Sequence, residues 1–339
     1  MKHPFEGVAL HDALREGAYN AVNVCLRVKP EEKVTLITDE RTIDIAASVY
    51  NEIRKVGARC NVYVLEEFAP RPHTDIPQEI LDDLATSQVS VYAVSGQMGE
   101  LRTRMQLTRV VTKHKIRHGH MININQRIMQ EGMRADFNKV DEISGKVWDL
   151  AKRATYVNAR TKRGTDIHAE FSPSLKWLKT SGIISPDKWG NLPGGEVFTA
   201  PLMVNGMFIV DGVVGDYLCA KYGDLNDSPL TIEVKDNRIT QIFSDNKELE
   251  QEFWDYCHTD ENSPRVGEFA IGTNIQLKHV IGHILQDEKI PGVHIAFGHP
   301  YAEHTGANWT SSTHIDVVGT KFDIWIEDRK IMHEGEFLI

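Results

Sequence analysis

Residues 32–65 read E-K-V-T-L-I-T-D-E-R-T-I-D-I-A-A-S-V-Y-N-E-I-R-K-V-G-A-R-C-N-V-Y-V-L and decide the fold class of the first half of the chain. The runs 32–38 and 60–65 are short, apolar and rich in β-branched residues, which is typical of buried strands. Between them, residues 41–56 carry apolar side chains at helical spacing, and Gly57 ends this helix. A strand, a helix and a strand in this order predict a βαβ unit with a parallel pair of strands.

The same alternation continues on both sides of this unit. Further strands are predicted at residues 89–94 and 118–124. Further helices are predicted at residues 7–28, 77–86, 102–112 and 138–154. The sequence therefore predicts an α/β N-terminal domain with a mostly parallel sheet over residues 1–155. A nucleotide-binding role is disfavoured, because no G-x-G-x-x-G follows the first strand and the chain contains no P-loop sequence.

After residue 155, strand-like runs separated by turns dominate the sequence. These runs are found at residues 155–161, 165–171, 195–200, 208–214, 230–234 and 238–243. Two helices, at residues 247–258 and 275–286, are predicted among them. This pattern predicts a β-rich α+β C-terminal catalytic domain over residues 156–339.

Composition excludes several classes of protein. The 339 residues carry a net charge of -10, whereas a nucleic-acid surface needs a basic stripe. The four cysteines are widely spaced and form no C-x-x-C pair, which fits a reducing compartment. No apolar run approaches the roughly 18 residues of a membrane-spanning helix, and the opening M-K-H-P-F-E-G has no apolar signal core. We therefore expect a cytoplasmic protein that binds neither nucleic acid nor membranes.

Three segments of the second half place potential metal ligands beside apolar runs. In N-L-P-G-G-E-V-F-T-A-P and R-V-G-E-F-A-I-G-T-N, Glu196 and Glu268 each follow a glycine and begin a run that should be buried. The third segment comprises residues 292–318 and contains two predicted strands, at 293–297 and 313–318. His294 lies at the start of the first strand. His314 and Asp316 lie two residues apart on the second and so share a face. Buried carboxylates are costly unless they are paired, hydrogen-bonded or bound to a cation. Together these side chains are a plausible ligand set for two divalent metal ions.

Each of these residues also has a simpler interpretation when it is taken alone. A Gly-Glu pair at the start of a strand is usually a solvated turn, and a His-x-Asp pair is often a surface pair. His299 and His304 follow on a loop and are predicted to line the substrate pocket. Asp166 and His168 repeat the carboxylate–imidazole spacing on another predicted strand, where we interpret them as a pocket pair.

The combination of the three segments is more specific than any one of them. P-G-G-E-V-F-T-A-P, G-E-F-A-I-G-T-N, and H-I-A-F-G-H-P-Y followed by S-S-T-H-I-D-V-V resemble, in this order, the aminopeptidase T family of metallopeptidases, also called the thermophilic or leucyl aminopeptidase-like family. The metal ligands that the resemblance implies are Glu196, Glu268, His294, His314 and Asp316. It also implies that Tyr301 is the catalytic tyrosine, which would donate to the oxyanion. In the mechanism that we expect, a glutamate moves a proton to the leaving amine, and we assign this role to Glu196.

The resemblance further implies two divalent metal ions (zinc, cobalt or manganese), a homodimer, and removal of N-terminal residues from peptides by a metal-activated water. The chain is shorter than the peptidases of that family, so an amidase acting on a small non-peptide amide is an alternative. A mononuclear Fe(II) ring-cleaving dioxygenase resembling dihydroxypyridine dioxygenase is another, because two histidines and a carboxylate can form its iron site. A metal-stabilised binding module is a third reading, although structural sites are more often closed sets of cysteine and histidine.

Overall fold

A computed structural model describes residues 3–97 and 99–339 and divides the chain into two compact units. The first unit comprises Met1–Asn138 and Gly182–Gly194, and the second comprises Lys139–Ser181 and Gly195–Ile339. The predicted domain boundary after residue 155 stays a prediction. In the two units described here, most of the helix predicted at 138–154 belongs to the second unit. Within the described ranges, no helix is both long and apolar enough to cross a membrane.

The first unit is built on a five-stranded sheet with the strand order β2-β1-β3-β4-β8. Its strands are β1 (Lys33–Thr38), β2 (Arg59–Val64), β3 (Val89–Val94), β4 (Arg117–Ile122) and β8 (Gly190–Asn191). All four neighbouring pairs in this order are parallel, so the predicted βαβ unit is confirmed. The β1 and β3 strands are buried along nearly their whole length, which explains why they read as continuous apolar runs.

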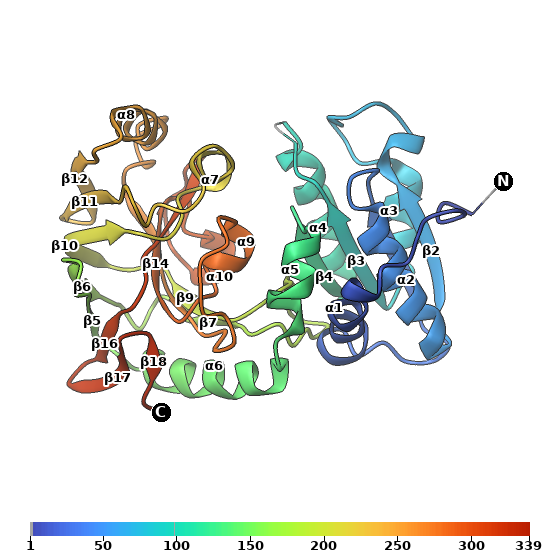
Figure 1. Ribbon diagram of the computed structural model, residues 1–339, viewed down its shortest axis with the longest axis horizontal. Helices are drawn as coiled ribbons and strands as arrows, with labels where there is room; N and C mark the ends of the chain where they lie inside the picture. Colours follow the sequence, from blue (N-terminus) through green and yellow to red (C-terminus); the bar gives the residue numbers. More distant parts are fainter. Residues whose placement is uncertain (1–2, 98) are drawn as a thin grey trace. The chain divides into compact units, whose positions relative to one another are not determined.

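Helices pack against this sheet (Figure 1). The helices of this unit are α1 (Arg15–Tyr19), α2 (Ile43–Val56), α3 (Gln78–Leu84), α4 (Leu101–His114) and α5 (Gln126–Gln130). Apolar residues of α3 and α4 form one core cluster with side chains of β1 and β3, while α2 contacts β1 and β2. The helix predicted at residues 7–28 begins later, as a 3-10 turn at Asp12–Leu14, and ends in a π-helical turn at Asn20–Cys25.

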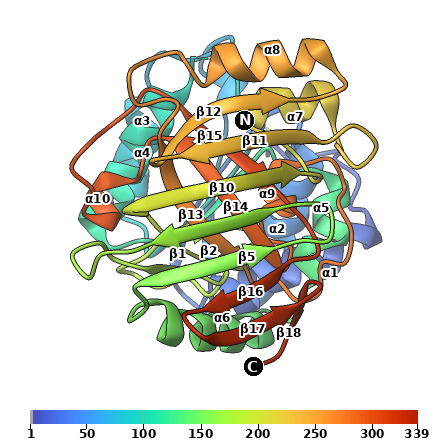
Figure 2. The same ribbon diagram turned by 90° about the vertical axis from the view of Figure 1, so that its left-hand side faces the viewer.

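The second unit contains an antiparallel sheet of eight strands, whose order β12-β11-β10-β6-β5-β16-β17-β18 can be followed in Figure 2. Its strands are β5 (Tyr156–Arg160), β6 (Asp166–Glu170), β10 (Met203–Val210), β11 (Leu230–Lys235), β12 (Arg238–Phe243), β16 (Asp323–Ile326), β17 (Arg329–His333) and β18 (Glu336–Phe337). The helices of this unit are α6 (Phe137–Ala151), α7 (Asp216–Tyr222), α8 (Lys247–Tyr256), α9 (Ile284–Asp287) and α10 (Ala302–Thr305).

A second antiparallel sheet, of five strands, carries the residues of interest. Its order is β15-β14-β13-β9-β7, and its strands are β7 (Leu178–Thr180), β9 (Glu196–Thr199), β13 (Val266–Gly272), β14 (Gly292–Gly298) and β15 (His314–Val318). Apolar side chains of both sheets, among them Phe208 and Ile324 from one and Phe269 and Ile295 from the other, form a single buried cluster. The predicted fold class, a parallel α/β domain followed by a β-rich α+β domain, is confirmed.

The helix predicted at residues 275–286 is wrong over most of its length. Only α9 is helical there, and residues before it form turns and bends. The buried carboxylate of Asp287 accepts hydrogen bonds from the N–H groups of Ile281, at 3.0 Å, and His283, at 2.8 Å. These bonds hold the chain in a loop, and local capture of backbone donors by a carboxylate is an alternative to helix that periodicity does not reveal.

Candidate metal centre

All five predicted ligands lie on one face of the five-stranded sheet. They are Glu196 at the start of β9, Glu268 on β13, His294 on β14, and His314 and Asp316 on β15. The pairing registers of β9, β13, β14 and β15 put these positions in phase, so their side chains leave the same face. The intervening residues point the other way into the apolar core, which explains why each donor is flanked by aliphatic or aromatic residues.

Glycines bring the backbone close to neighbouring segments beside each glutamate. The register of β13 with β14 shifts at Gly267, and a Cβ there would lie 2.4 Å from the carbonyl oxygen of Gly298. Gly195 has φ of 135°, and a Cβ there would lie 2.7 Å from the Cβ of Asn274. Only glycine is compatible with such close approaches. Close packing of the backbone therefore explains why a glycine precedes each glutamate, and the two Gly-Glu pairs are not ordinary surface turns.

The donor atoms converge on one another. The Nε2 atom of His294 lies 3.5 Å from Glu196 Oε2 and 3.4 Å from Glu268 Oε1. The Nε2 atom of His314 lies 3.4 Å from Asp316 Oδ1 and 3.8 Å from Glu268 Oε2. Glu268 is therefore placed between the two imidazoles, with one carboxylate oxygen toward each. The structure thus brings together residues that are up to 120 positions apart in the sequence.

Two overlapping groups of side chains have the spacing of metal ligands. Donor atoms of Glu196, Glu268 and His294 lie within 4.8 Å of one another, and so do donor atoms of Glu288, His294 and Asp316. The Nδ1 atom of His294 is buried and has no hydrogen-bond partner among the residues that the structure describes. Carboxylate and imidazole donors suit zinc, cobalt and manganese, so these side chains fit a divalent ion.

Glu288 and Lys289 belong to this cluster, and our sequence prediction missed both. The ammonium of Lys289 lies 2.6 Å from Glu288 Oε1 and 2.7 Å from Glu196 Oε2, and its side chain is only 1% exposed. Acidic and basic residues are usually on the surface, which is why neither was singled out. The available signal was their position in D-E-K-I, directly before the buried strand β14.

Tyr301 lies beside the cluster at the start of α10. Its ring centroid is 4.7 Å from that of His314 and 6.2 Å from that of Phe198. Its backbone has φ of 47°, a left-handed conformation that is uncommon outside glycine. Tyr301 as a whole is 37% exposed, so part of the residue is open to solvent. Partial burial and the carboxylates of Glu268 and Asp316 raise the pKa of Tyr301 well above its usual value, so the hydroxyl keeps its proton.

Comparison with known proteins identifies the family. The model of the family described as thermophilic metalloprotease (M29) matches residues 120–337, well over half of the chain. The chain belongs to this family. Family membership confirms the resemblance seen in the sequence and makes the chain a metal-dependent peptidase, for which peptides are the expected class of substrate. No curated protein matches the sequence.

Two solved structures share the fold of this metalloprotease. The 2,5-dihydroxypyridine dioxygenase from Pseudomonas putida KT2440 aligns with a TM-score of 0.73 and 14% identity over 96% of each chain. Wild-type AmpT from Thermus thermophilus aligns with a TM-score of 0.70 and 16% identity over 99% of this chain and 100% of that one. Identities this low show a common fold and do not by themselves transfer an activity. The family match, not these alignments, therefore favours the peptidase over the dioxygenase.

The surroundings of the candidate ligands shift their pKa values in different directions. Burial raises the pKa of Glu268. Burial acts in the same direction on Glu196, but the charges of Lys289 and His294, with hydrogen bonds from Lys289 and Thr180, outweigh it and lower the pKa of Glu196. Burial disfavours the charged form of His314, yet Asp316 raises its pKa to about 10, while His314 lowers that of Asp316 to about 2 despite burial. Without metal, His314 is thus protonated near neutral pH, and a cation that binds there must displace this proton.

The remaining predicted pocket residues have different surroundings. The backbone carbonyl of His299 accepts a hydrogen bond from His314, whereas His304 lies 3.9 Å from Glu303 and is half exposed. Asp166 and His168 lie on β6 of the other sheet, where they contact Arg160 and Asn158. Only His299 of these four is bonded to a predicted metal ligand in the contacts that the described residues make.

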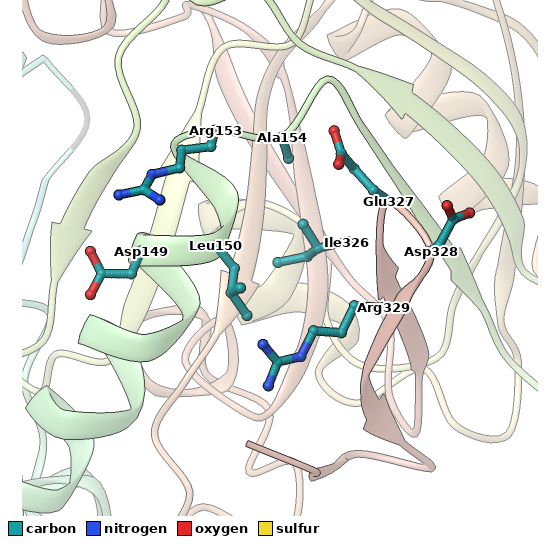
Figure 3. A pocket seen from close by; sticks show the side chains of 8 residues that line it. All are labelled: Asp149, Leu150, Arg153, Ala154, Ile326, Glu327, Asp328 and Arg329. Atoms are coloured by element: carbon teal, nitrogen blue, oxygen red, sulfur yellow. The ribbon is translucent and has the colours of Figure 1, made fainter.

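A surface pocket of the second unit lies apart from the cluster. It has a volume of about 370 Å³ and is formed where the end of α6 meets the turn between β16 and β17 (Figure 3). Leu150 and Ile326 supply its apolar part, while Arg153 and Arg329 extend beside it (Figure 3). None of its lining residues is a candidate metal ligand, so this pocket is not part of the metal centre.

Proposed function

We propose that the chain is an aminopeptidase that holds two divalent ions, zinc, cobalt or manganese, through Glu196, Glu268, His294, His314 and Asp316. The observation that carries this proposal is the convergence of these five side chains on one face of the five-stranded sheet. Glu288 adds a sixth donor from the loop before β14. A set so rich in carboxylates favours two ions over one, because carboxylates can bridge a metal pair about 3.5–4 Å apart.

When bound, the metal ions would polarise the scissile carbonyl group and activate water. The chain's own residues supply the remaining functions. Tyr301, protonated and partly exposed, donates a hydrogen bond to the oxyanion that develops on the carbonyl oxygen. A carboxylate accepts the proton from water and returns it to the leaving amine.

Glu268 suits this proton transfer better than Glu196, to which we assigned it from the sequence. Glu196 accepts from the Thr180 hydroxyl through Oε1, at 2.7 Å, and pairs with the Lys289 ammonium through Oε2, whereas the partners of Glu268 are the imidazoles of His294 and His314. Its pKa is lowered, which makes it a weak base, whereas burial raises the pKa of Glu268. We therefore propose Glu196 as a ligand and Glu268 as both ligand and proton acceptor.

The decisive experiment combines metal analysis with an assay. Protein stripped with chelator and dialysed against zinc, cobalt or manganese should retain about two ions per chain and should hydrolyse leucine p-nitroanilide. Metal-loaded protein that is inert on a panel of aminoacyl amides but cleaves a small non-peptide amide would overturn the aminopeptidase in favour of an amidase. One iron per chain with oxygen uptake on 2,5-dihydroxypyridine would overturn hydrolysis altogether.

We also propose that the protein is cytoplasmic and forms a homodimer, on the basis of cysteine usage and family resemblance. Light scattering coupled to size-exclusion chromatography should give twice the mass of 38.3 kDa. A mass of one chain across the micromolar range would exclude the dimer.

A further inference from the structure

Lys289 is a buried ammonium group inside the candidate metal centre. It lies 2.7 Å from Glu196 and 2.6 Å from Glu288, and these two carboxylates belong to different donor groups of the centre. A lysine that is 1% exposed is unusual, because removing an ammonium group from water is costly unless it is fully paired. Here pairing with two carboxylates supplies the compensation.

The backbone around Lys289 fixes its side chain in this place. Its N–H donates to the carbonyl of Gln286 at 2.9 Å, and its own carbonyl accepts from the N–H of Asn274 at 2.9 Å. On the far side, Thr180 holds the second oxygen of Glu196. The ammonium is thus held by neighbouring segments, and it links the loop before β14 to the first residue of β9.

Lys289 also compensates part of the negative charge in the candidate metal centre. Glu196, Glu268, Glu288 and Asp316 crowd four carboxyl groups into one small volume. In the ion pairs formed by the described residues, Lys289 is the one lysine or arginine that contacts any of them; the other partners are histidines. Without a metal ion, carboxylates this close repel one another.

We propose that Lys289 is a built-in counter-ion of the metal centre: it holds Glu196 and Glu288 in place before metal binds, and its charge opposes the entering divalent cation. It is a positioning residue that acts through the ligands, not a catalytic one. This proposal rests on the proposed metal ligation. Its consequence is that removing Lys289 destabilises the metal-free protein and strengthens metal binding.

The test compares Lys289→Met with Lys278→Met, measuring melting temperature with and without metal, and zinc affinity by competition with a chromophoric chelator. Lys278 is a matched control because it forms an exposed ion pair with Glu336 at 3.2 Å in the same unit. We expect Lys289→Met to melt several degrees below wild type when metal-free, to recover most of this loss with zinc, and to bind zinc about tenfold more tightly. Lys278→Met should change neither quantity measurably.

A second variant covers the case in which Lys289→Met does not fold. Glu288→Gln/Lys289→Met removes one negative charge together with the lysine, so the metal-free protein should regain much of its stability. Zinc binding by Lys289→Met that is unchanged or weaker, or a metal-free double variant no more stable than Lys289→Met, would refute the counter-ion role. Failure of wild-type protein to bind any divalent ion would instead refute the proposed metal centre itself.

Discussion

The Nδ1 atom of His314 donates a hydrogen bond to the backbone carbonyl oxygen of His299, over 2.8 Å. Because a carbonyl can only accept, the bond puts a proton on Nδ1 and turns Nε2 toward Asp316 and Glu268. This is the arrangement that a histidine metal ligand needs, in which the second ring nitrogen is fixed by an acceptor. His299, which lies two residues before Tyr301, therefore also orients the candidate ligand His314.

Glu268→Gln should remove metal and activity together. Glutamine keeps the size of the side chain but carries no charge between the imidazoles of His294 and His314, and it cannot accept a proton. We expect metal affinity to fall by more than about 100-fold, since even residues that only support a ligand contribute 10–100-fold. Metal content after dialysis, followed by the peptidase assay, measures this. Glu303→Gln, at an exposed position of α10, is the control, and full activity of Glu268→Gln would disprove the site.

Tyr301→Phe should separate catalysis from binding. The ring remains to pack beside His314 and Phe198, while the hydroxyl that would meet the oxyanion is lost. Loss of one such donor typically lowers kcat by about 10²–10³-fold, so we expect this fall with KM and metal content near those of wild type. Steady-state kinetics with leucine p-nitroanilide gives both constants. Tyr217→Phe, at an exposed position of α7, should behave as wild type, and an equal kcat for both variants would exclude the role of Tyr301.

Most strands could be predicted because burial on one or both faces of a strand gives a recognisable pattern of apolar residues. The β3 strand was predicted with its observed bounds, and the i, i+2 rule placed His314 and Asp316 on one face, as observed. Periodicity failed at residues 275–286, where Asp287 captures the backbone donors of a loop. Convergence of segments far apart in the chain was not readable from spacing and came from the family resemblance.

Glu288 and Lys289 were missed for a different physical reason. A charged pair after a helical segment is normally solvated, and the sequence alone gives no measure of burial. Glu288 and Lys289 are buried because the loop before β14 approaches β13. At this approach, a Cβ added to Gly272 would lie 2.0 Å from the carbonyl oxygen of Ile290. Such a close backbone contact depends on tertiary structure; the sequence shows only that D-E-K-I lies just before the apolar run of β14.

Gly267→Ala should damage the centre through the backbone. The added Cβ would lie 2.4 Å from a carbonyl oxygen of β14, so the bulge that precedes Glu268 must move. We expect a loss of about 2 kcal/mol or more in the free energy of unfolding, with weakened metal binding. Gly145→Ala is the matched control, because Gly145 lies in α6 with no atom within 4 Å of its added Cβ. That variant should be more stable by about 0.5–1 kcal/mol. Equal stabilities in urea denaturation would contradict the argument.

Glu100→Gln tests a buried ion pair of the first unit and its dependence on pH. The side chain of Arg71 is 2% exposed and contacts Asp39 and Glu100, and its Nε donates to Glu100 over 2.9 Å. Burial alone would raise the pKa of Glu100, but the hydrogen bonds and charge of Arg71, with the N–H of His73, outweigh it and lower the pKa. Breaking a pair of this kind costs about 3–5 kcal/mol, so we expect a loss of that order at pH 7.

The pH dependence of this loss has a definite sign. A carboxyl group whose pKa is lower in the folded than in the unfolded chain contributes its full stabilisation above the unfolded pKa, about 4.3 for glutamate. That contribution disappears as the pH falls through the folded pKa, so wild type and Glu100→Gln should converge in acid. Denaturation series from pH 7 to pH 3 measure the difference, with Glu16→Gln as control because its pair with Arg134 is exposed. A difference that stays constant across this range would show that the charge of Glu100 does not stabilise the fold.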